Sequence, residues 1–184
     1  MGRIGSTIDE RTAAFVESQP VFFVATAPLD AGGHVNCSPK GNRGELVVLD
    51  ERRAAYLDQT GSGIETVAHL RENGRIVLMA CAFAGPPRIV RLHGRGEVVP
   101  AGDPRFAELR GRFSAPPAAD VGARSVVVVT VDRVSDSCGY GVPLMAFEAH
   151  RDTMQAWADR KGVDGIASYQ AEKNAVSIDG LPGL

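Results

Sequence analysis

The amino-acid sequence predicts a mainly β fold, a six- to seven-stranded antiparallel barrel with peripheral helices. Four short strand-like segments precede the first long helical segment. In a doubly wound sheet, helices would instead alternate with strands from the start. Near residue 130 the run Val-Val-Val-Val-Thr-Val has the continuous apolar character of a strand buried on both faces. We therefore expect that strand to lie at the centre of the barrel.

Length and composition indicate one globular unit. The chain has 184 residues, 44% of them hydrophobic, and a net charge of −2. This charge argues against a nucleic-acid surface, and no apolar run or N-terminal signal pattern suggests a membrane or an export route. We expect a single cytoplasmic domain over residues 1–184, with an N-terminal helical arm (1–20) and a C-terminal helical and loop extension (145–184). Three cysteines without Cys-x-x-Cys spacing indicate neither disulfides nor a metal site.

The first third of the chain predicts one helix and two strand pairs. A capping box of Thr7 and Glu10 begins the helix, and Pro20 ends it. The strand pairs follow around glycine and acidic turns. The expected ranges are 7–19 for the helix and 21–27, 34–39, 45–49 and 54–57 for the strands.

The rest of the chain predicts a hairpin, a central strand and further helices. A Gly-Pro-Pro turn separates the two strands of the hairpin, and Asp103 followed by Pro104 is typical of a helix start. The expected helices are 62–74, 103–113 and 151–161, and the expected strands are 75–84, 88–99 and 125–134.

The stretch 57–66 is a candidate anion site. An apolar run meets a turn rich in hydroxyls and glycine, which opens into a helix. The first N–H groups of a helix lack partners and carry the positive end of its dipole, so they favour a phosphate. Ser62 and Glu65 form a second capping box that would orient those groups. The alternative is an ordinary capped strand-to-helix turn.

A small barrel has an interior filled by its own side chains. A ligand would therefore lie outside the barrel, most easily in a groove between two copies of the chain. This argument predicts a homodimer with its ligand at the subunit interface.

Several separated motifs then occur in a familiar order. They are Asn-Cys-Ser-Pro-Lys-Gly (36–41), Tyr-Leu-Asp-Gln-Thr-Gly-Ser-Gly (56–63), His-Leu-Arg-Glu-Asn-Gly-Arg-Ile (69–76), the segment 85–96, Ser-Cys-Gly-Tyr-Gly-Val-Pro (137–143) and the ending 177–184. Together they make residues 20–184 resemble the pyridoxamine 5'-phosphate oxidase-like family, in its uncharacterised bacterial and fungal branch.

The resemblance implies an FMN-binding split barrel, a dimer, and FMN bound at the dimer interface. The phosphate candidates carried over are Lys40, Thr60, Ser62 and Thr66, with Gly61 and Gly63 allowing close approach of the backbone. Asn36, Ser38 and Gln59 are candidates for the ribityl hydroxyls or the ring edge, and Arg91 is a further basic candidate. In each case the alternative is an ordinary strand cation or turn residue.

The sequence departs from the oxidase that names the family. Its C-terminal part has neither the Arg-x-His segment that grips the substrate nor the Arg-Leu-Ala-Pro ending. The expected function is therefore an FMN-dependent oxidoreductase acting on a small molecule other than pyridoxamine phosphate. The alternatives are a reductase using the deazaflavin coenzyme F420, and a flavin- or haem-binding protein without turnover.

Overall fold

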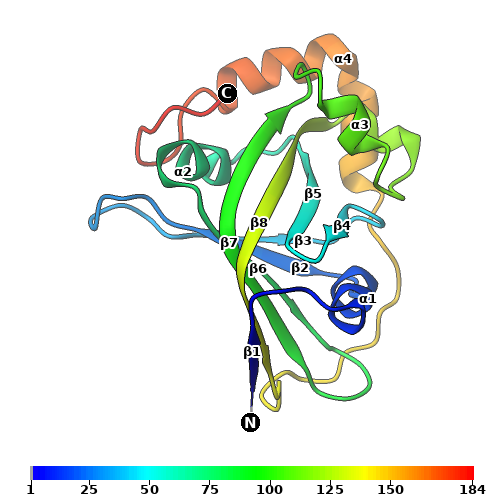
Figure 1. The fold of residues 1–184 in the computed structure, drawn as a ribbon. Coiled ribbons are helices and arrows are strands. Elements are labelled where there is room, and N and C mark those ends of the chain that lie inside the picture. The colour runs from blue at the N-terminus through cyan, green and yellow to red at the C-terminus, as the bar shows by residue number, and fades with distance from the viewer. Residues whose placement is uncertain (1) are drawn as a thin grey trace.

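A computed structural model describes residues 2–184 and places their strands in one open antiparallel sheet (Figure 1). The strand order is β3-β2-β6-β7-β8-β5-β4, and β1 pairs with β8 beside this path. Because β3 and β4 are the two ends of the order and do not pair, the barrel is split along this line. The strands are β1 (Arg3–Gly5), β2 (Phe22–Thr26), β3 (Asn36–Lys40), β4 (Leu46–Asp50), β5 (Arg53–Gln59), β6 (Arg75–Cys81), β7 (Ile89–Pro100) and β8 (Ala123–Ser137).

This sheet confirms the predicted antiparallel barrel. The seven strands of the main path correspond to the seven predicted strands. The eighth, β1, has only three residues, too few to show a pattern in sequence.

The longest pairing joins β7 to β8, the strand predicted to be central. Val126, Val127 and Val129 are fully buried, and they contribute to two hydrophobic clusters on opposite faces of the sheet. The register shifts between His93 and Gly94. A Cβ on Gly94 would lie only 2.0 Å from the Thr130 carbonyl oxygen, so this bulge requires glycine.

The larger cluster fills the space between α1 (Glu10–Ser18) and the sheet. Val16 of α1 joins Phe22, Tyr56 and Leu92 there, and the Phe22 and Tyr56 rings meet edge to face at 5.8 Å. The smaller cluster packs β5 and β8 against α3 (Phe106–Arg110) and the short 3-10 helix η1 (Pro117–Asp120).

Two helix starts differ from the predicted caps. Asp9, not Thr7, caps α1, and its side chain accepts from the Thr12 N–H. The helix expected from Asp103 is only the short α3, because Asp103 accepts from the Arg105 N–H in a turn that precedes it. At α1, the Asp9 carboxylate two residues after Thr7 competes equally well for the first free N–H groups.

α2 (Glu65–Asn73) ends as predicted, at Gly74 with φ 70°. α4 (Thr153–Lys173) is longer than the predicted helix 151–161, because a second helical segment follows a kink at Gly162, where φ is 62°. Two glycines, at 162 and 165, weaken the helical pattern in this second half. α4 lies across one end of the barrel (Figure 1).

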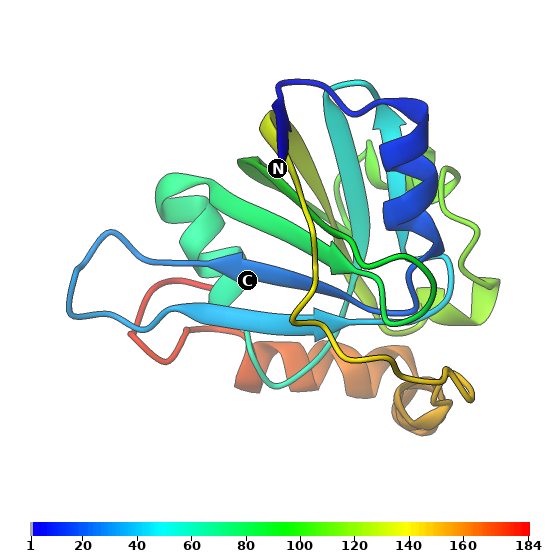
Figure 2. The same ribbon diagram turned by 90° about the horizontal axis from the view of Figure 1, so that it is seen from below.

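Residues 138–152 form an irregular connection from β8 to α4, which we call the strap. Figures 1 and 2 show it running along the outside of the barrel from the far end of β8 to α4. The Met145 N–H donates to the Phe83 carbonyl at 2.8 Å, and His150 Nδ1 lies 2.8 Å from the Gly41 carbonyl oxygen. The strap is therefore fastened to the sheet beside β3.

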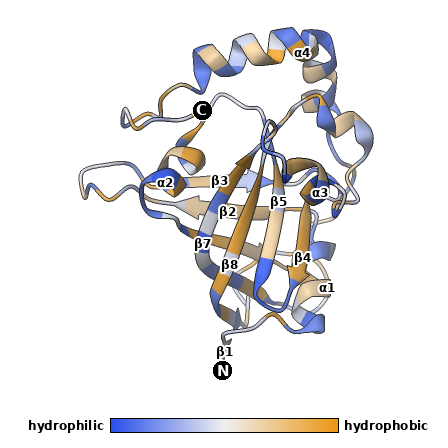
Figure 3. Cartoon of the chain, turned by 45° about the horizontal axis from the view of Figure 1, so that its top comes forward, coloured by the Kyte–Doolittle hydropathy of each residue, from blue (hydrophilic) through white to orange (hydrophobic). Residues whose placement is uncertain are grey.

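Figure 3 shows that the most hydrophobic segments are strands of the sheet, whereas α4 has hydrophilic and hydrophobic stretches mixed along its length. Among residues 2–184, no helix combines the length and apolarity needed to cross a membrane.

Candidate functional site

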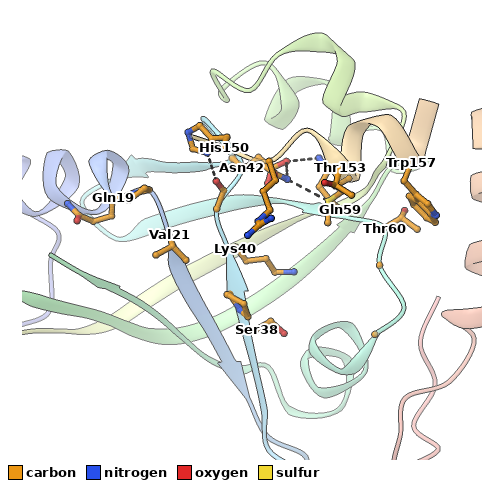
Figure 4. Close-up of a pocket in the computed structure, with 18 of the residues that line it drawn as sticks. Gln19, Val21, Ser38, Lys40, Asn42, Gln59, Thr60, His150, Thr153 and Trp157 are labelled. Atoms are coloured by element: carbon orange, nitrogen blue, oxygen red, sulfur yellow. Dashed lines mark hydrogen bonds between the residues drawn. The ribbon is translucent and has the colours of Figure 1, made fainter. Parts of the chain in front are cut away.

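A cavity of about 1370 Å³ lies outside the barrel, between β3, the end of β5, the strap and α4 (Figure 4). One group of lining residues is apolar or aromatic: Pro20, Val21, Phe83, Met145, Phe147, Met154, Trp157 and Tyr169. Another group carries cations, hydroxyls and amides, and includes Lys40, Ser62 and Gln59. A cavity with both kinds of wall suits an amphipathic organic ligand.

Nine of the ten predicted site residues line this cavity. They are Asn36, Ser38, Lys40, Gln59, Thr60, Gly61, Ser62, Gly63 and Thr66. The tenth, Arg91, lies on β7 away from the cavity lining, and its Nη1 donates to Ser137 Oγ at 3.3 Å. A role for any of the ten in cofactor binding remains a prediction.

The polar wall rests on a buried charge cluster around Asp58. The Asp58 carboxylate accepts from Lys40 Nζ at 3.1 Å and from Arg124 Nε at 2.6 Å, and its side chain is fully buried. Burial opposes ionisation, but the two cations outweigh it and hold the pKa of Asp58 below its usual range. With one negative and two positive charges, the cluster carries a net charge of +1. Lys40 Nζ has three N–H donors and gives one to Asp58, so it keeps donors for a ligand.

The turn after β5, residues 60–64, is fixed by hydrogen bonds from two residues far along the chain. The Gly61 carbonyl accepts from Asn174 Nδ2 at 2.9 Å, and the Gly63 carbonyl accepts from Arg124 Nη1 at 2.9 Å. In a trans peptide the N–H points opposite to the C=O. The N–H groups of Ser62 and Ile64 therefore point away from Asn174 and Arg124, and within residues 2–184 no hydrogen-bond acceptor is found for them.

The predicted capping box at the start of α2 does not form. The N-cap position is Ile64, no side chain caps the helix, and Glu65 instead accepts from the Ile178 N–H at 3.4 Å. Ser62 lies two positions before the N-cap and is too far along the turn to cap the helix. As a result the exposed Ser62 hydroxyl stays available to a ligand beside uncapped N–H groups.

Other predicted residues are already engaged within the protein. Asn36 Nδ2 donates to Thr66 Oγ1 at 2.9 Å, and Ser38 Oγ donates to Asn36 Oδ1 at 3.0 Å. Thr60 Oγ1 accepts from Gln170 Nε2 of α4 at 2.8 Å. These contacts fix the orientation of the wall, and hydroxyl and amide groups retain further capacity for a ligand.

Several residues of the site were not found from sequence. Arg124 and Trp157 line the cavity from segments far along the chain, and Glu45 lines it from just before β4. Gln170 and Asn174 bond to the wall residues Thr60 and Gly61. One signal was present for Asp58: a carboxylate directly after the apolar residues 54–57 of a buried strand requires a cation. Nothing local to Asn174 indicates its partner.

Comparison with known proteins identifies the family to which this chain belongs. A family model described as pyridoxamine 5'-phosphate oxidase matches residues 8–138. A pyridoxamine 5'-phosphate oxidase family protein, ustO, of Aspergillus flavus is 41% identical over 180 residues, covering 90% of this chain and 71% of the relative. The fold and cavity thus belong to a split-barrel protein of the oxidase type. This chain is a member of the pyridoxamine 5'-phosphate oxidase family.

Solved structures agree on the fold. A conserved hypothetical protein of Mycobacterium tuberculosis matches with a TM-score of 0.51 at 18% identity, over 80% of this chain and 96% of that one. An FMN-binding protein of Syntrophomonas wolfei matches with a TM-score of 0.50 at 14% identity, over 68% of this chain and 82% of that one.

Proposed function

We propose that the protein is an FMN-dependent oxidoreductase acting on a small organic molecule other than pyridoxamine phosphate. The observation that carries this proposal is the cavity itself, where a turn with oriented N–H groups and Lys40 lies near apolar and aromatic walls. FMN combines a phosphate, a polyhydroxyl chain and a planar ring. The similarity to an FMN-binding protein of the same fold gives independent support.

The donor set fits the phosphate of FMN. Lys40 Nζ, the Ser62 hydroxyl and the Ser62 N–H line the cavity and would supply charge-assisted donors. Arg124 Nε and Nη1 are engaged by Asp58, Gly63 and Asn174, so we assign these donors to ordering the turn.

The remaining lining residues fit the rest of the molecule. Ser38, Asn36, Gln59, Thr60 and Thr66 would face the ribityl hydroxyls or the polar ring edge. The apolar residues Val21, Phe83, Met145 and Trp157 would cover the ring.

Once bound, the flavin supplies hydride or electron transfer, and the protein contributes binding and orientation. Residues of the strap and of α4 line the cavity and so would limit access of water to the ring. The absence of the Arg-x-His segment from the C-terminal sequence supports a substrate other than pyridoxamine phosphate.

We further infer a homodimer in which a second copy completes the cavity. Phe23, Val77 and Met79 are only partly buried on the sheet face opposite the larger core cluster. On the strap, Tyr140 is 82% exposed and Leu144 is 81% exposed. Apolar surface of this extent is typical of a protein contact. Sedimentation should give twice the chain mass, and a monomeric mass would contradict this inference.

An absorption spectrum of the purified protein, followed by a reduction assay, tests the proposed function. Flavin bands that bleach with a reductant and return with an electron acceptor are expected. Flavin bands without any reaction would favour a flavin carrier. A Soret band would favour haem binding, and a colourless protein that takes up F420 but not FMN would favour a deazaflavin reductase.

A further inference from the structure

Glu45 is a buried carboxyl group in the wall of the cavity. It precedes β4, and the residue is only 3% exposed. Its Oε1 accepts from Gln59 Nε2 at 2.7 Å and from Asn42 Nδ2 at 3.1 Å. Figure 4 shows Asn42 and Gln59 close together at this end of the cavity, near Thr153. Its backbone is also held, because its carbonyl accepts from the Leu57 N–H at 2.9 Å.

Asp58 has cations that balance its charge, whereas Glu45 has none in contact among residues 2–184. These two carboxyls are the buried ones among residues 2–184. Asp58 has two cations in contact, whereas Glu45 forms no ion pair within this part of the chain. A buried charge without a partner is unstable relative to its neutral form. Burial accordingly raises the pKa of Glu45.

The hydrogen bonds determine where a proton on Glu45 must sit. Oε1 already accepts two N–H groups, so the neutral acid carries its proton on Oε2. No partner for Oε2 is found in residues 2–184, yet Oε2 is not among the polar atoms sealed from solvent without a partner, which are Tyr56 Oη and His69 Nε2. Oε2 therefore keeps contact with solvent where Glu45 lines the main cavity and the smaller one beside it.

We propose that Glu45 is the proton-exchanging residue of the cavity, and that its Oε2–H donates a hydrogen bond to a carbonyl or anionic oxygen of the bound organic ligand. This inference rests on the proposed function, because it assumes that the cavity is the ligand site. Binding would then be coupled to the uptake of one proton by Glu45.

The charges around Glu45 favour this direction of coupling. The nearest charged groups are Lys40 on β3 and Asp58 on β5. Other charged or titratable residues that line the two adjoining cavities are Glu17, Arg43, Glu65, Arg124, His150, Arg151, Arg160 and Tyr169. Cations outnumber carboxylates in the main cavity, so an anionic ligand is expected there. A bound anion disfavours the carboxylate form of Glu45 and raises its pKa further.

Linkage gives the expected pH dependence. A ligand that raises the pKa of Glu45 binds more tightly as the pH falls from the pKa of Glu45 in the complex to its pKa in the free protein. The affinity rises by at most about tenfold per pH unit for one proton. In E45Q, the replacement amide keeps an oxygen for Asn42 and Gln59 and turns a permanent N–H donor towards the cavity. E45Q should therefore hold the low-pH affinity at every pH.

The test is an FMN titration of the full chain at a series of pH values that begins in the ordinary glutamate range and continues upward. The phosphate of FMN titrates in every variant. The quantity to compare is therefore the ratio of the FMN dissociation constant of the wild type to that of E45Q at each pH. This ratio should change with pH. The control is Glu108→Gln, an exposed carboxyl of α3 outside the lining of both cavities, and it should retain the wild-type pH dependence.

The outcomes separate the two proposals. A constant ratio between wild type and E45Q, with FMN bound by both, would overturn the role of Glu45 and leave the proposed function intact. Failure of the wild-type protein to bind FMN at any pH would overturn both. Infrared spectra of the ligand-free protein give a second reading, because a band of protonated carboxyl should titrate above the ordinary glutamate range and be missing in E45Q.

Discussion

Asn174, fully buried at the end of α4, bridges the Gly61 carbonyl at 2.9 Å and the Arg124 guanidinium at 3.0 Å. The first of these contacts spans 113 positions of the sequence. The C-terminal segment therefore stabilises the turn that we propose holds the phosphate. The order of this turn depends on residues outside the barrel.

Replacing Asn174 with alanine should loosen this turn. Two buried hydrogen bonds are lost, and the free energy of unfolding should fall by about 1–3 kcal/mol. FMN affinity should fall roughly tenfold, because the Ser62 N–H loses its fixed direction. Urea denaturation and FMN titration measure the two effects. Asn73→Ala is the control, since Asn73 Nδ2 donates to the Ala27 carbonyl away from the cavity. Equal loss of FMN affinity in both variants would contradict this role.

Removing two phosphate donors at once should weaken FMN binding strongly. Charge-assisted hydrogen bonds are worth about 1.5–3 kcal/mol each, so Lys40→Ala with Ser62→Ala should cost several kcal/mol of binding free energy. Asp58 keeps Arg124 as a partner in this variant. The control is Lys173→Ala with Ser168→Ala, two exposed residues of α4. If the first pair binds FMN as tightly as the control pair, the phosphate site lies elsewhere.

Asp58→Asn should destabilise the protein by about 3–5 kcal/mol near neutral pH, because the buried Arg124 and the half-buried Lys40 lose their shared anion. The folded-state pKa of Asp58 is depressed. Its contribution to stability is therefore present above the ordinary aspartate pKa and is lost as the pH falls through the depressed value. Urea denaturation at neutral and at acid pH should show the gap between wild type and variant narrowing in acid. Asp132→Asn, an exposed residue of β8, should show no comparable gap.

Asp179 fastens the C-terminal loop to the turn between β2 and β3. Its carboxylate accepts from the His34 N–H at 2.8 Å and lies 2.6 Å from His34 Nδ1. Asp179→Asn should speed hydrogen exchange at the amides of Ser177, Gly180 and Gly183, with little change in global stability. Unchanged exchange at these amides, matching that of the remote control Asp164→Asn, would show that this contact does not restrain the loop.

Much of the fold could be predicted from local patterns. The Val-rich run at 126–131 identified the central strand, and the Gly-Pro-Pro turn identified the β6–β7 hairpin. Helix starts were less predictable. Thr7 and Ser62 have the spacing of a capping box, but Asp9 competes for the first N–H groups and the helix after Ser62 begins at a later residue. Such competition is decided by tertiary packing.

The candidate site was also predictable only in part. The residues of 36–40 and 59–66 that we predicted line one cavity, because they lie on adjacent parts of β3 and of the turn after β5. Their partners Arg124 and Asn174 come from β8 and the end of α4. No pattern in a single sequence reports such long-range contacts.

The most direct test of the central claim is a fluorescence titration of the purified protein with FMN. Saturation at one FMN per chain, with an affinity that falls in the Lys40 and Ser62 double variant but not in its surface control, is the result we predict. No quenching at any FMN concentration, or equal affinity in all three proteins, would contradict FMN binding at this cavity.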